Sequence, residues 1–511
     1  MNTQGRRSLL GAGMLLSLAL MAGRLAGFGR EMLLASSLGL SAQADVAIVL
    51  LTIPDLLVNL LLSGGIGIAL IPAMRAADGR HAAALFWQST LVVGGVFTLI
   101  GLGFAMSPEL WFRVLAPGLD NIGKMLEGGV SYAMAVAIPL TALAGVTTAA
   151  LNARDRFFVA GSGTLIFNLC VIGGLMLAFL FEGEYLIWLC AGILAGTVLR
   201  WLSQWAAMMH VGLLGKRLGN LNCGWLLDVA MIKSFAAGLA AASLLILVPV
   251  VLRAAASWLG AGEMAAFNYA IKLVELPLAI LITTLATVAF PRLSEAHSKK
   301  DSVGFDRFLQ HGLRRSIVLS CAVILCGWPF VDSAVALLFG MGRIDQAGLA
   351  HIATLTQVAL LSVPWAGISG LAAAALNARL QPVRVLRRTL SVMLILPLLC
   401  LPGLWLHDAR LLMWALPGFH LILAFNLAWA AGGVCLRPGL LSSRTILAGL
   451  LAMILVAVLA SIFDVLVIAP IGDWSPGAIE FWRVGLAGLS FFVVAGVGLY
   501  ALRCSEQSQE K

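Results

Sequence analysis

The stretch LLGAGMLLSLALMAGRLAGFGREMLLASSLGL, residues 9–40, decides the fold, because it is apolar over more than the length of a bilayer-spanning helix and yet carries charge. About 20 apolar residues in a helix cross the hydrocarbon core of a membrane. Arg24 and Arg30 lie inside the stretch, and Glu31 follows directly. Arg24 stands where a secretory signal would have its small-residue cleavage site, so we expect a retained first membrane helix.

The composition excludes a soluble fold. Of the 511 residues, 61% are hydrophobic and 11% are charged, with a mean hydropathy of +0.99, whereas soluble domains carry about 25% charged residues. The sequence contains neither a GxxxxGK[ST] phosphate loop nor CxxC or Cys/His metal spacing, which argues against ATP-driven transport and against a metal site. We therefore expect an all-α polytopic membrane protein without a cofactor.

Hydropathy and loop signals divide the chain into about fourteen expected membrane spans. Several contain a proline, namely Pro54, Pro139, Pro277 and Pro364, which predicts tilted or kinked helices. The approximate spans are 8–38, 44–73, 82–106, 125–152, 157–181, 185–212, 229–258, 262–291, 308–340, 347–377, 384–406, 410–435, 444–469 and 479–502.

Positive charge is distributed unevenly between the two sets of loops. Loops that follow even-numbered spans hold most of the cations, such as Arg75 and Arg80 or Arg154 and Arg156, and the opposite loops are nearly free of them. Because Lys and Arg concentrate in cytoplasmic loops, both termini are expected in the cytoplasm. The same pattern accounts for the net charge of +9 without a nucleic-acid partner.

Two pairs of similar segments indicate an internal repeat. TTAALNARDRFFV (147–159) resembles AAAALNARLQPVR (372–384), 225 residues later, and ALIPAMRAADGRH (69–81) resembles VAFPRLSEAHSKK (288–300), 219 residues later. This predicts two six-helix lobes related by a pseudo-two-fold axis along the membrane normal, as in alternating-access transporters. We expect an N-lobe over 1–218, a C-lobe over 219–438, and a C-terminal helix pair with a short tail over 439–511.

Ionisable residues at membrane depth are the candidates for the functional site, because a charge there costs about 2.5–3.5 kcal/mol and usually faces a protein interior or a watery cavity. Arg24 lies too deep to reach the surface easily, whereas Arg30 either borders the same cavity or snorkels to the outer surface. Asp45 either neutralises Arg30 or caps the start of its own helix, the second expected span. The candidates are Arg24, Arg30, Asp45, Asp55, Lys272 and Glu275.

Lys272 and Glu275 have i,i+3 spacing in FNYAIKLVELPLAI and form either an internal salt bridge or part of an anion site. Cations from both lobes facing one cavity would bind a diphosphate, for which the forked guanidinium of arginine is suited. The glycines of LSGGIGIAL (62–70) are typical of close helix packing. The alternative is a flexible gate, with Ser63, Gly64 and Gly65 as its candidates.

These motifs resemble those of the MurJ/MviN lipid II flippases of the MOP exporter superfamily, over essentially the whole chain. The family stretch S-R-x-x-G-F-x-R-[DE] is matched by Arg24, Arg30 and Glu31. Its I-P-N-L-L segment appears as IPDLL (53–57), and its Y-x-x-R-L-x-E-[FL]-P motif as YAIKLVELP (269–277). The resemblance implies fourteen helices and a central cavity in which Arg24, Arg30 and Lys272 bind the diphosphate of the substrate, with Asp45 as an essential polar partner.

The chain departs from the family pattern after Pro54. Where the family usually reads L-L-R-R-x-F-A-E-G, this chain reads LLVNLLLSGG, so Val58 and Asn59 replace two arginines and Ser63 replaces a glutamate. Lys272 likewise replaces an arginine and loses the planar fork. We therefore keep two substrates open: lipid II, and another undecaprenyl-diphosphate-linked saccharide such as an exopolysaccharide precursor.

We expect a flippase of a bacterial inner membrane, not an enzyme, that moves such a lipid from the cytoplasmic to the outer leaflet by alternating access. An ion that the sequence does not identify could drive it through Asp45, Asp55 or Glu275. The alternative is a cation-coupled multidrug exporter of the same superfamily, with Asp55 or Glu275 as its membrane carboxylate. We expect a monomer among membrane lipids, and contact with glycan-synthesis enzymes remains open.

Overall fold

The computed structural model of the protein is helical and contains no strand over the residues that it describes, which are 3–61, 66–120, 122–127, 129–181, 184–210, 224–432 and 476–510. Ten helical segments within these ranges are long and apolar enough to cross a membrane. The prediction of an all-α, polytopic membrane protein is therefore confirmed. The expected thirteenth span, 444–469, lies outside the described residues, so the count of fourteen stays a prediction.

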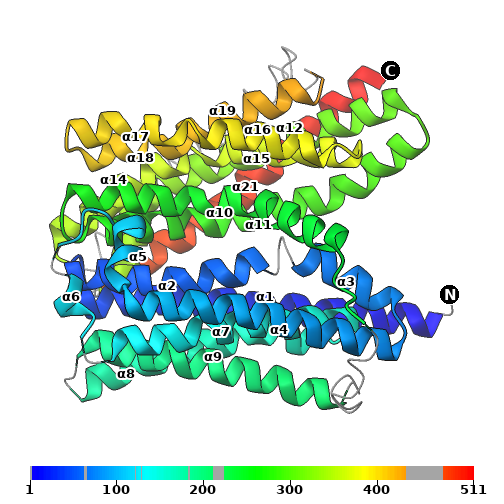
Figure 1. The fold of residues 1–511 in the computed structure, drawn as a ribbon. Coiled ribbons are helices and arrows are strands. Elements are labelled where there is room, and N and C mark those ends of the chain that lie inside the picture. The colour runs from blue at the N-terminus through cyan, green and yellow to red at the C-terminus, as the bar shows by residue number, and fades with distance from the viewer. Residues whose placement is uncertain are drawn as a thin grey trace. The chain divides into compact units, whose positions relative to one another are not determined.

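Contacts within the chain group it into two compact units, Met1–Ala265 and Ala266–Lys511. Helix α10, expected in the C-lobe, contacts α2 and α3 in the first unit. The lobe boundaries at 218/219 and 438/439 stay predictions. The helices of the N-terminal unit are α1 (Thr3–Leu38), α2 (Ala42–Leu60), α3 (Ile66–Ala76), α4 (Gly79–Met106), α5 (Pro108–Leu115), α6 (Ile122–Met125), α7 (Val130–Ala153), α8 (Phe157–Leu180), α9 (Tyr185–His210), α10 (Val229–Ala256) and the short η3 (Ser257–Leu259), as Figure 1 shows.

The second unit contains the helices from α11 onward, although α11 itself begins just before the boundary. They are α11 (Glu263–Ser298), α12 (Ser302–Gly327), η4 (Trp328–Phe330), α13 (Val331–Phe339), α14 (Gln346–Leu360), α15 (Val363–Ala378), α16 (Pro382–Met393), α17 (Leu396–Trp405), α18 (Ala409–Met413), α19 (Ala415–Ala430) and α21 (Pro476–Glu510).

Several expected spans consist of two helices rather than one. The span expected at 308–340 is interrupted by η4, where Pro329 lies at the start of the 3-10 turn. The span at 347–377 breaks between α14 and α15, and Pro364 lies in the first turn of α15. Proline lacks the N–H that would continue the helical hydrogen-bond ladder, so a break just before it is the expected outcome.

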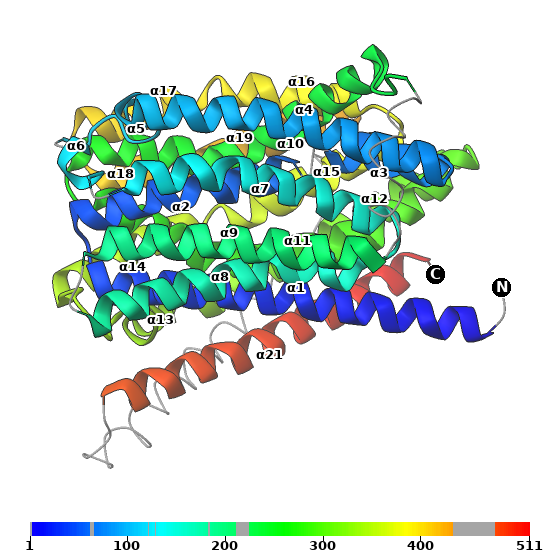
Figure 2. The same cartoon turned by 60° about the horizontal axis from the view of Figure 1, so that its bottom comes forward.

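Helix α7 is the centre of the N-terminal unit. It contacts α2, α3, α4, α8 and α9, and Figure 2 shows it running alongside α4 and α9. Its buried Val146 and Leu151 pack with Met74, Phe86 and Met208 in one apolar cluster. The helices that carry the candidate site in this unit are therefore held around a common apolar core.

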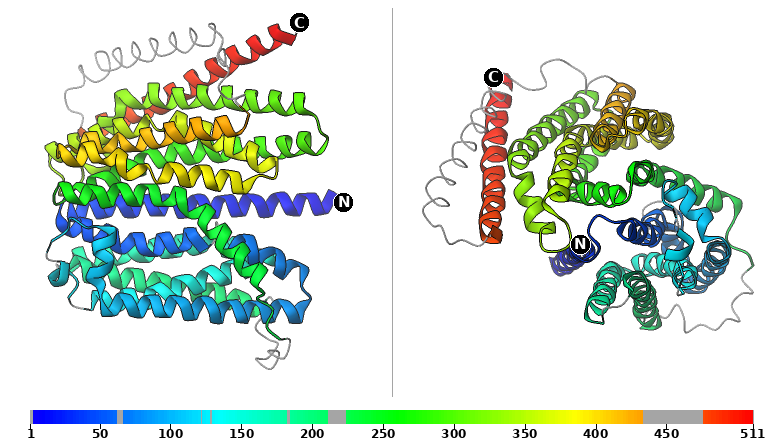
Figure 3. Two further views of the ribbon diagram at one scale, coloured as in Figure 1. Left: turned by 45° about the horizontal axis from the view of Figure 1, so that its top comes forward. Right: turned by 90° about the vertical axis from the view of Figure 1, so that its left-hand side faces the viewer.

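In the second unit, α15 packs against α12, α16 and α19, and the C-terminal α21 packs against α12 and α13. The end-on view in Figure 3 shows α21 beside the helices of this unit. Cys326, Phe330, Val494 and Ala495 form the buried contact between them. The last helix is thus attached to the unit through apolar side chains.

The internal repeat is visible in the local backbone of two turns. After α7, Asp155 has a positive φ of 59° and the N–H of Arg156 donates to the carbonyl of Leu151. After α15, Leu380 has a φ of 58° and the N–H of Gln381 donates to the carbonyl of Leu376. Each of these positions is displaced by the 225 residues that separate the two sequence segments. The two segments therefore end their helices with the same left-handed cap, which supports a duplication, while the symmetry axis stays a prediction.

Candidate functional site

Small residues bring the arginine-bearing part of α1 close to α8. A Cβ on Gly23 would lie 3.3 Å from Cβ of Thr164, and a Cβ on Gly27 would lie 3.1 Å from Nδ2 of Asn168. Glycines four residues apart face the same side of a helix, so α1 presents a flat strip on which α8 packs closely. This contact brings Asn168 within reach of the Arg30 side chain.

Arg30 is the centre of a buried hydrogen-bond network, and its residue is only 4% exposed. Its Nη2 donates to Oε1 of Glu31 at 2.7 Å and to Oδ2 of Asp55 at 3.0 Å, and its Nη1 donates to Oδ1 of Asn168 at 3.0 Å. Asn168 Nδ2 in turn donates to the carbonyl of Gly23 at 3.0 Å. The network joins α1, α2 and α8, so Arg30 faces the interior of the unit and does not snorkel.

One guanidinium, that of Arg30, binds two carboxylates in this network. Glu31 is buried, whereas the side chain of Asp55 is 42% exposed. Asp55 therefore presents part of its carboxylate beyond the pair while it binds Arg30. Such pairing is the arrangement that makes a buried arginine tolerable in a low-dielectric interior.

A second buried arginine, Arg200, lies near this network. It was not among the site residues predicted from the sequence. Arg200 on α9 is 3% exposed, and its charge interacts with that of Asp55. Gly163 on α8 leaves the room for it, since a Cβ there would lie 2.9 Å from Nε of Arg200. Arg200 is a lone arginine within the expected span 185–212, and the rule that singled out Arg24 would have found it.

Arg24 differs from both buried arginines, because it is exposed. Over the described part of the chain its side chain has no hydrogen-bond or ion-pair partner within bonding distance. The offset of six residues from Arg24 to Arg30 rotates the side chain by about 240° around the helix, which accounts for one side chain being buried and the other exposed. Arg24 is thus available to an anion, whereas Arg30 is not.

Asp45 has a role that neither of its two sequence interpretations described. Its carboxylate is fully buried and accepts hydrogen bonds from the N–H groups of Gly262 at 2.7 Å and Ala265 at 2.8 Å. It therefore caps the first turn of α11, while Ser41 caps its own helix α2. A Cβ on Gly262, whose φ is 87°, would lie 2.6 Å from the carbonyl carbon of Leu40. The start of α11 is therefore packed tightly on the turn before α2.

Lys272 and Glu275 form the internal salt bridge that was one of the two alternatives for them. Lys272 Nζ lies 2.8 Å from Oε2 of Glu275, and their side chains are 31% and 45% exposed. Both groups remain partly open to solvent, as a binding role would require. The gate candidates Ser63, Gly64 and Gly65 lie outside the described residues.

The family model and the curated relatives point to one family. The sequence model described as "Lipid II flippase MurJ" matches residues 34–383. The lipid II flippase MurJ of Burkholderia cenocepacia is 28% identical over 352 residues, and this alignment covers 66% of the present chain and 66% of that relative. The match thus spans just under two thirds of the length of the curated relative.

Solved structures show the same fold. A lipid II flippase MurJ in an inward closed conformation superposes with a TM-score of 0.76 at 17% identity, covering 96% of this chain and 99% of that one. An inward-facing multidrug resistance MATE family transporter of the MOP superfamily gives a TM-score of 0.67 at 14% identity, covering 84% and 99%. Since the family model covers more than half of the chain, the protein belongs to the MurJ lipid II flippase family.

Proposed function

We propose that this protein is a flippase that moves an undecaprenyl-diphosphate-linked saccharide from the cytoplasmic to the outer leaflet of the bacterial inner membrane by alternating access. Its membership in the MurJ family is the observation that carries the proposal. It is a transporter rather than an enzyme. We include in this proposal that both termini are cytoplasmic and that the protein is a monomer. We also include that an ion, and no bound cofactor, drives the transport.

Arg24 supplies the main anion-binding group in this proposal. It is exposed on α1 and has no partner among the described residues, so a diphosphate could accept two hydrogen bonds from its guanidinium. In the second unit, Lys272 is a further candidate cation for the substrate, and it forms an ion pair with Glu275. Arg30 is bound by Glu31, Asp55 and Asn168 and fixes the orientation of α1 rather than binding the substrate itself.

The substrate is either lipid II or another lipid-linked saccharide. Asp55 neutralises Arg30 where the related motif has an asparagine, and Val58 and Asn59 stand where that motif has two arginines. Both changes lower the positive charge near α2, which favours a head group with less need for cationic contacts. Rescue of cells depleted of their own lipid II flippase would identify lipid II; failure to rescue, together with transport of another glycan precursor, would identify the second class.

The proposal is tested with purified protein in proteoliposomes that contain a fluorescent undecaprenyl-diphosphate saccharide. Arg24→Ala should abolish translocation while the protein still inserts and unfolds at its usual temperature. Arg80→Ala, which removes another exposed arginine from the first turn of α4, should leave the rate unchanged. Full translocation by Arg24→Ala would refute the role of this residue, and absence of any translocation by the unaltered protein would refute the flippase itself.

A cation-coupled multidrug exporter is the second candidate, and the fold similarity to a MATE transporter favours it. Such a transporter needs a membrane carboxylate that attracts organic cations. Asp55 and Glu275 are partly exposed but each already binds a cationic side chain, which weakens this candidate. Efflux of cationic dyes that Asp55→Asn or Glu275→Gln abolishes would support it.

A further inference from the structure

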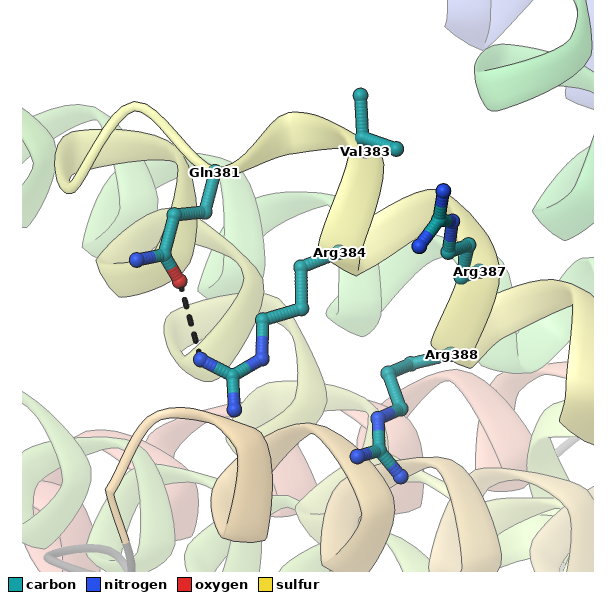
Figure 4. Close-up of a pocket in the computed structure, with 5 residues that line it drawn as sticks. All are labelled: Gln381, Val383, Arg384, Arg387 and Arg388. Carbon is teal, nitrogen blue, oxygen red and sulfur yellow. Dashed lines mark hydrogen bonds between the residues drawn. The ribbon is translucent and has the colours of Figure 1, made fainter.

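A cluster of three arginines on α16 lines a cavity of about 600 Å³ in the C-terminal unit. Arg384, Arg387 and Arg388 surround it together with Gln381 and Val383. Figure 4 shows the guanidinium groups of Arg384 and Arg388 extending from α16 to the same side. Spacings of three and four residues keep these side chains within one and a half turns of the helix.

The positive charge of this cluster is not compensated by acidic side chains. Arg384 Nη1 donates to Oε1 of Gln381 at 3.2 Å, and Arg388 Nη1 donates to Oδ1 of Asn426 at 3.2 Å. Both acceptors are neutral amides, and within the described ranges no carboxylate lies within 4 Å of the three guanidinium groups. The three side chains therefore leave positive charge at this cavity, and a bound anion would offset it.

The neighbouring Arg379, by contrast, is an arginine whose positive charge has partners within the protein. Its guanidinium lies 4.4 Å from the centre of the Phe305 ring and 3.8 Å from Oδ1 of Asp306. It also donates to the carbonyl of Ala431 at 2.9 Å. Arg379 therefore has a structural role, whereas the α16 cluster has donors left over for a ligand.

The position of the cluster indicates that its ligand is a lipid. Pro382–Trp405 is one of the segments apolar enough to cross a membrane, and the arginines occupy its first two turns. Its start therefore lies at the depth of the phospholipid head groups. Further along the same segment, Leu390 and Leu394 are exposed, so apolar surface for acyl chains follows directly on the basic cavity.

We propose that Arg384, Arg387 and Arg388 bind the phosphate of a lipid head group, with the acyl chains along α16 and α17. Basic pockets between membrane helices bind anionic head groups in this way. The phosphate can come from a bilayer phospholipid or from a lipid carrier diphosphate, and the same guanidinium chemistry would recognise both. This site is separate from the Arg30 network and does not depend on the proposed transport activity.

The test compares two double variants that remove equal charge from the full-length protein in neutral nanodiscs. Arg384→Gln with Arg387→Gln removes two guanidinium groups of the site and keeps Arg388 on Asn426. Arg80→Gln with Arg156→Gln is the control and removes two exposed arginines of the other unit, one in the first turn of α4 and one directly before α8. Binding is measured with fluorescent phosphatidylglycerol, undecaprenyl diphosphate and inorganic phosphate, and thermal unfolding confirms that each variant is folded.

The α16 double variant should bind phosphatidylglycerol roughly 20- to 30-fold more weakly, as expected for two interfacial arginines. The control variant, Arg80→Gln with Arg156→Gln, should bind within about twofold of the unaltered protein. An equal loss in both variants, or no loss in either, would overturn the proposal. So would binding of inorganic phosphate as tight as that of lipid. An arginine-dependent preference for undecaprenyl diphosphate would support the site and identify the lipid carrier as its ligand.

Discussion

The carboxylate of Asp45 accepts the backbone N–H of Gly262 at 2.7 Å, and this bond joins two residues that are 217 positions apart. A second bond from the N–H of Ala265 completes the cap of α11. The first N–H groups of a helix have no partner within it, so a carboxylate there satisfies donors and interacts favourably with the helix dipole. Asp45 thus anchors the start of α11 on α2, and any essential role of this residue has a structural component.

Asp45→Ala should destabilise the protein by about 2 kcal/mol, at the upper end of the range for a lost helix cap, because the residue is fully buried. Asp45→Asn should have a stability between those of the unaltered protein and Asp45→Ala, since its amide oxygen can accept only one of the two hydrogen bonds well. Thermal unfolding in detergent measures both. Asp408→Ala removes an exposed cap from the short α18 and should cost less; an equal cost would contradict the anchoring role.

The Arg30 network predicts unequal effects for its members. Arg30→Met should cost about 3 kcal/mol or more, because the buried carboxylate of Glu31 loses the guanidinium that it binds at 2.7 Å. Asp55→Asn should cost less than about 1 kcal/mol, since an amide oxygen still accepts from Arg30 and the site is partly exposed. Denaturation in detergent at matched lipid content provides the comparison.

The double variant Arg30→Met with Glu31→Gln separates charge from packing in this network. Removing the buried charge of Glu31, which has lost its arginine, should restore part of the stability lost in Arg30→Met. If the double variant is no more stable than Arg30→Met, the loss arises from the shape of the side chain and the electrostatic account is wrong.

Two adjacent glycines of α8 should respond in opposite directions to the same substitution. A Cβ on Gly174 would lie 2.4 Å from the carbonyl oxygen of Trp188 on α9, so Gly174→Ala should force the helices apart and cost about 1–3 kcal/mol. Gly173 has open space at its Cβ, and Gly173→Ala should stabilise by up to about 1 kcal/mol through helix propensity. The unfolding temperatures of the two variants test this prediction. A similar decrease of the unfolding temperature in both would exclude close α8–α9 packing at Gly174.

Span positions could be predicted from the sequence because hydropathy and loop charge mark where a helix enters and leaves a membrane. The expected span 157–181 corresponds to α8 (Phe157–Leu180), and 185–212 to α9 (Tyr185–His210). A kink in the span at 347–377 was expected from Pro364, but the complete breaks in this span and in the span at 308–340 were not predicted. Hydropathy remains high across a break such as that between α14 and α15, and only the position of Pro364 signals it.

The site was predicted in part. The depth of Arg30 in the bilayer singled it out, but its partner Asp55 could not be identified, because that pairing depends on how α1 packs on α2 and α8. Asp45 was expected to act near its own helix and instead caps α11, a contact between residues far apart in sequence. Pairings of this kind follow from tertiary packing, which local sequence patterns do not encode.

The repeated turn gives a final prediction, at Leu380. This residue adopts a φ of 58° and is 82% exposed, so its side chain gains little packing while its backbone is in a region that costs about 1 kcal/mol or more for a residue with a Cβ. Leu380→Gly should therefore stabilise the protein by up to about 1 kcal/mol, and Leu380→Ala should not. Leu390→Gly, at an exposed position inside α16, should destabilise by about 1 kcal/mol. Destabilisation by Leu380→Gly as large as that by Leu390→Gly, measured by thermal unfolding, would show that the turn is not left-handed.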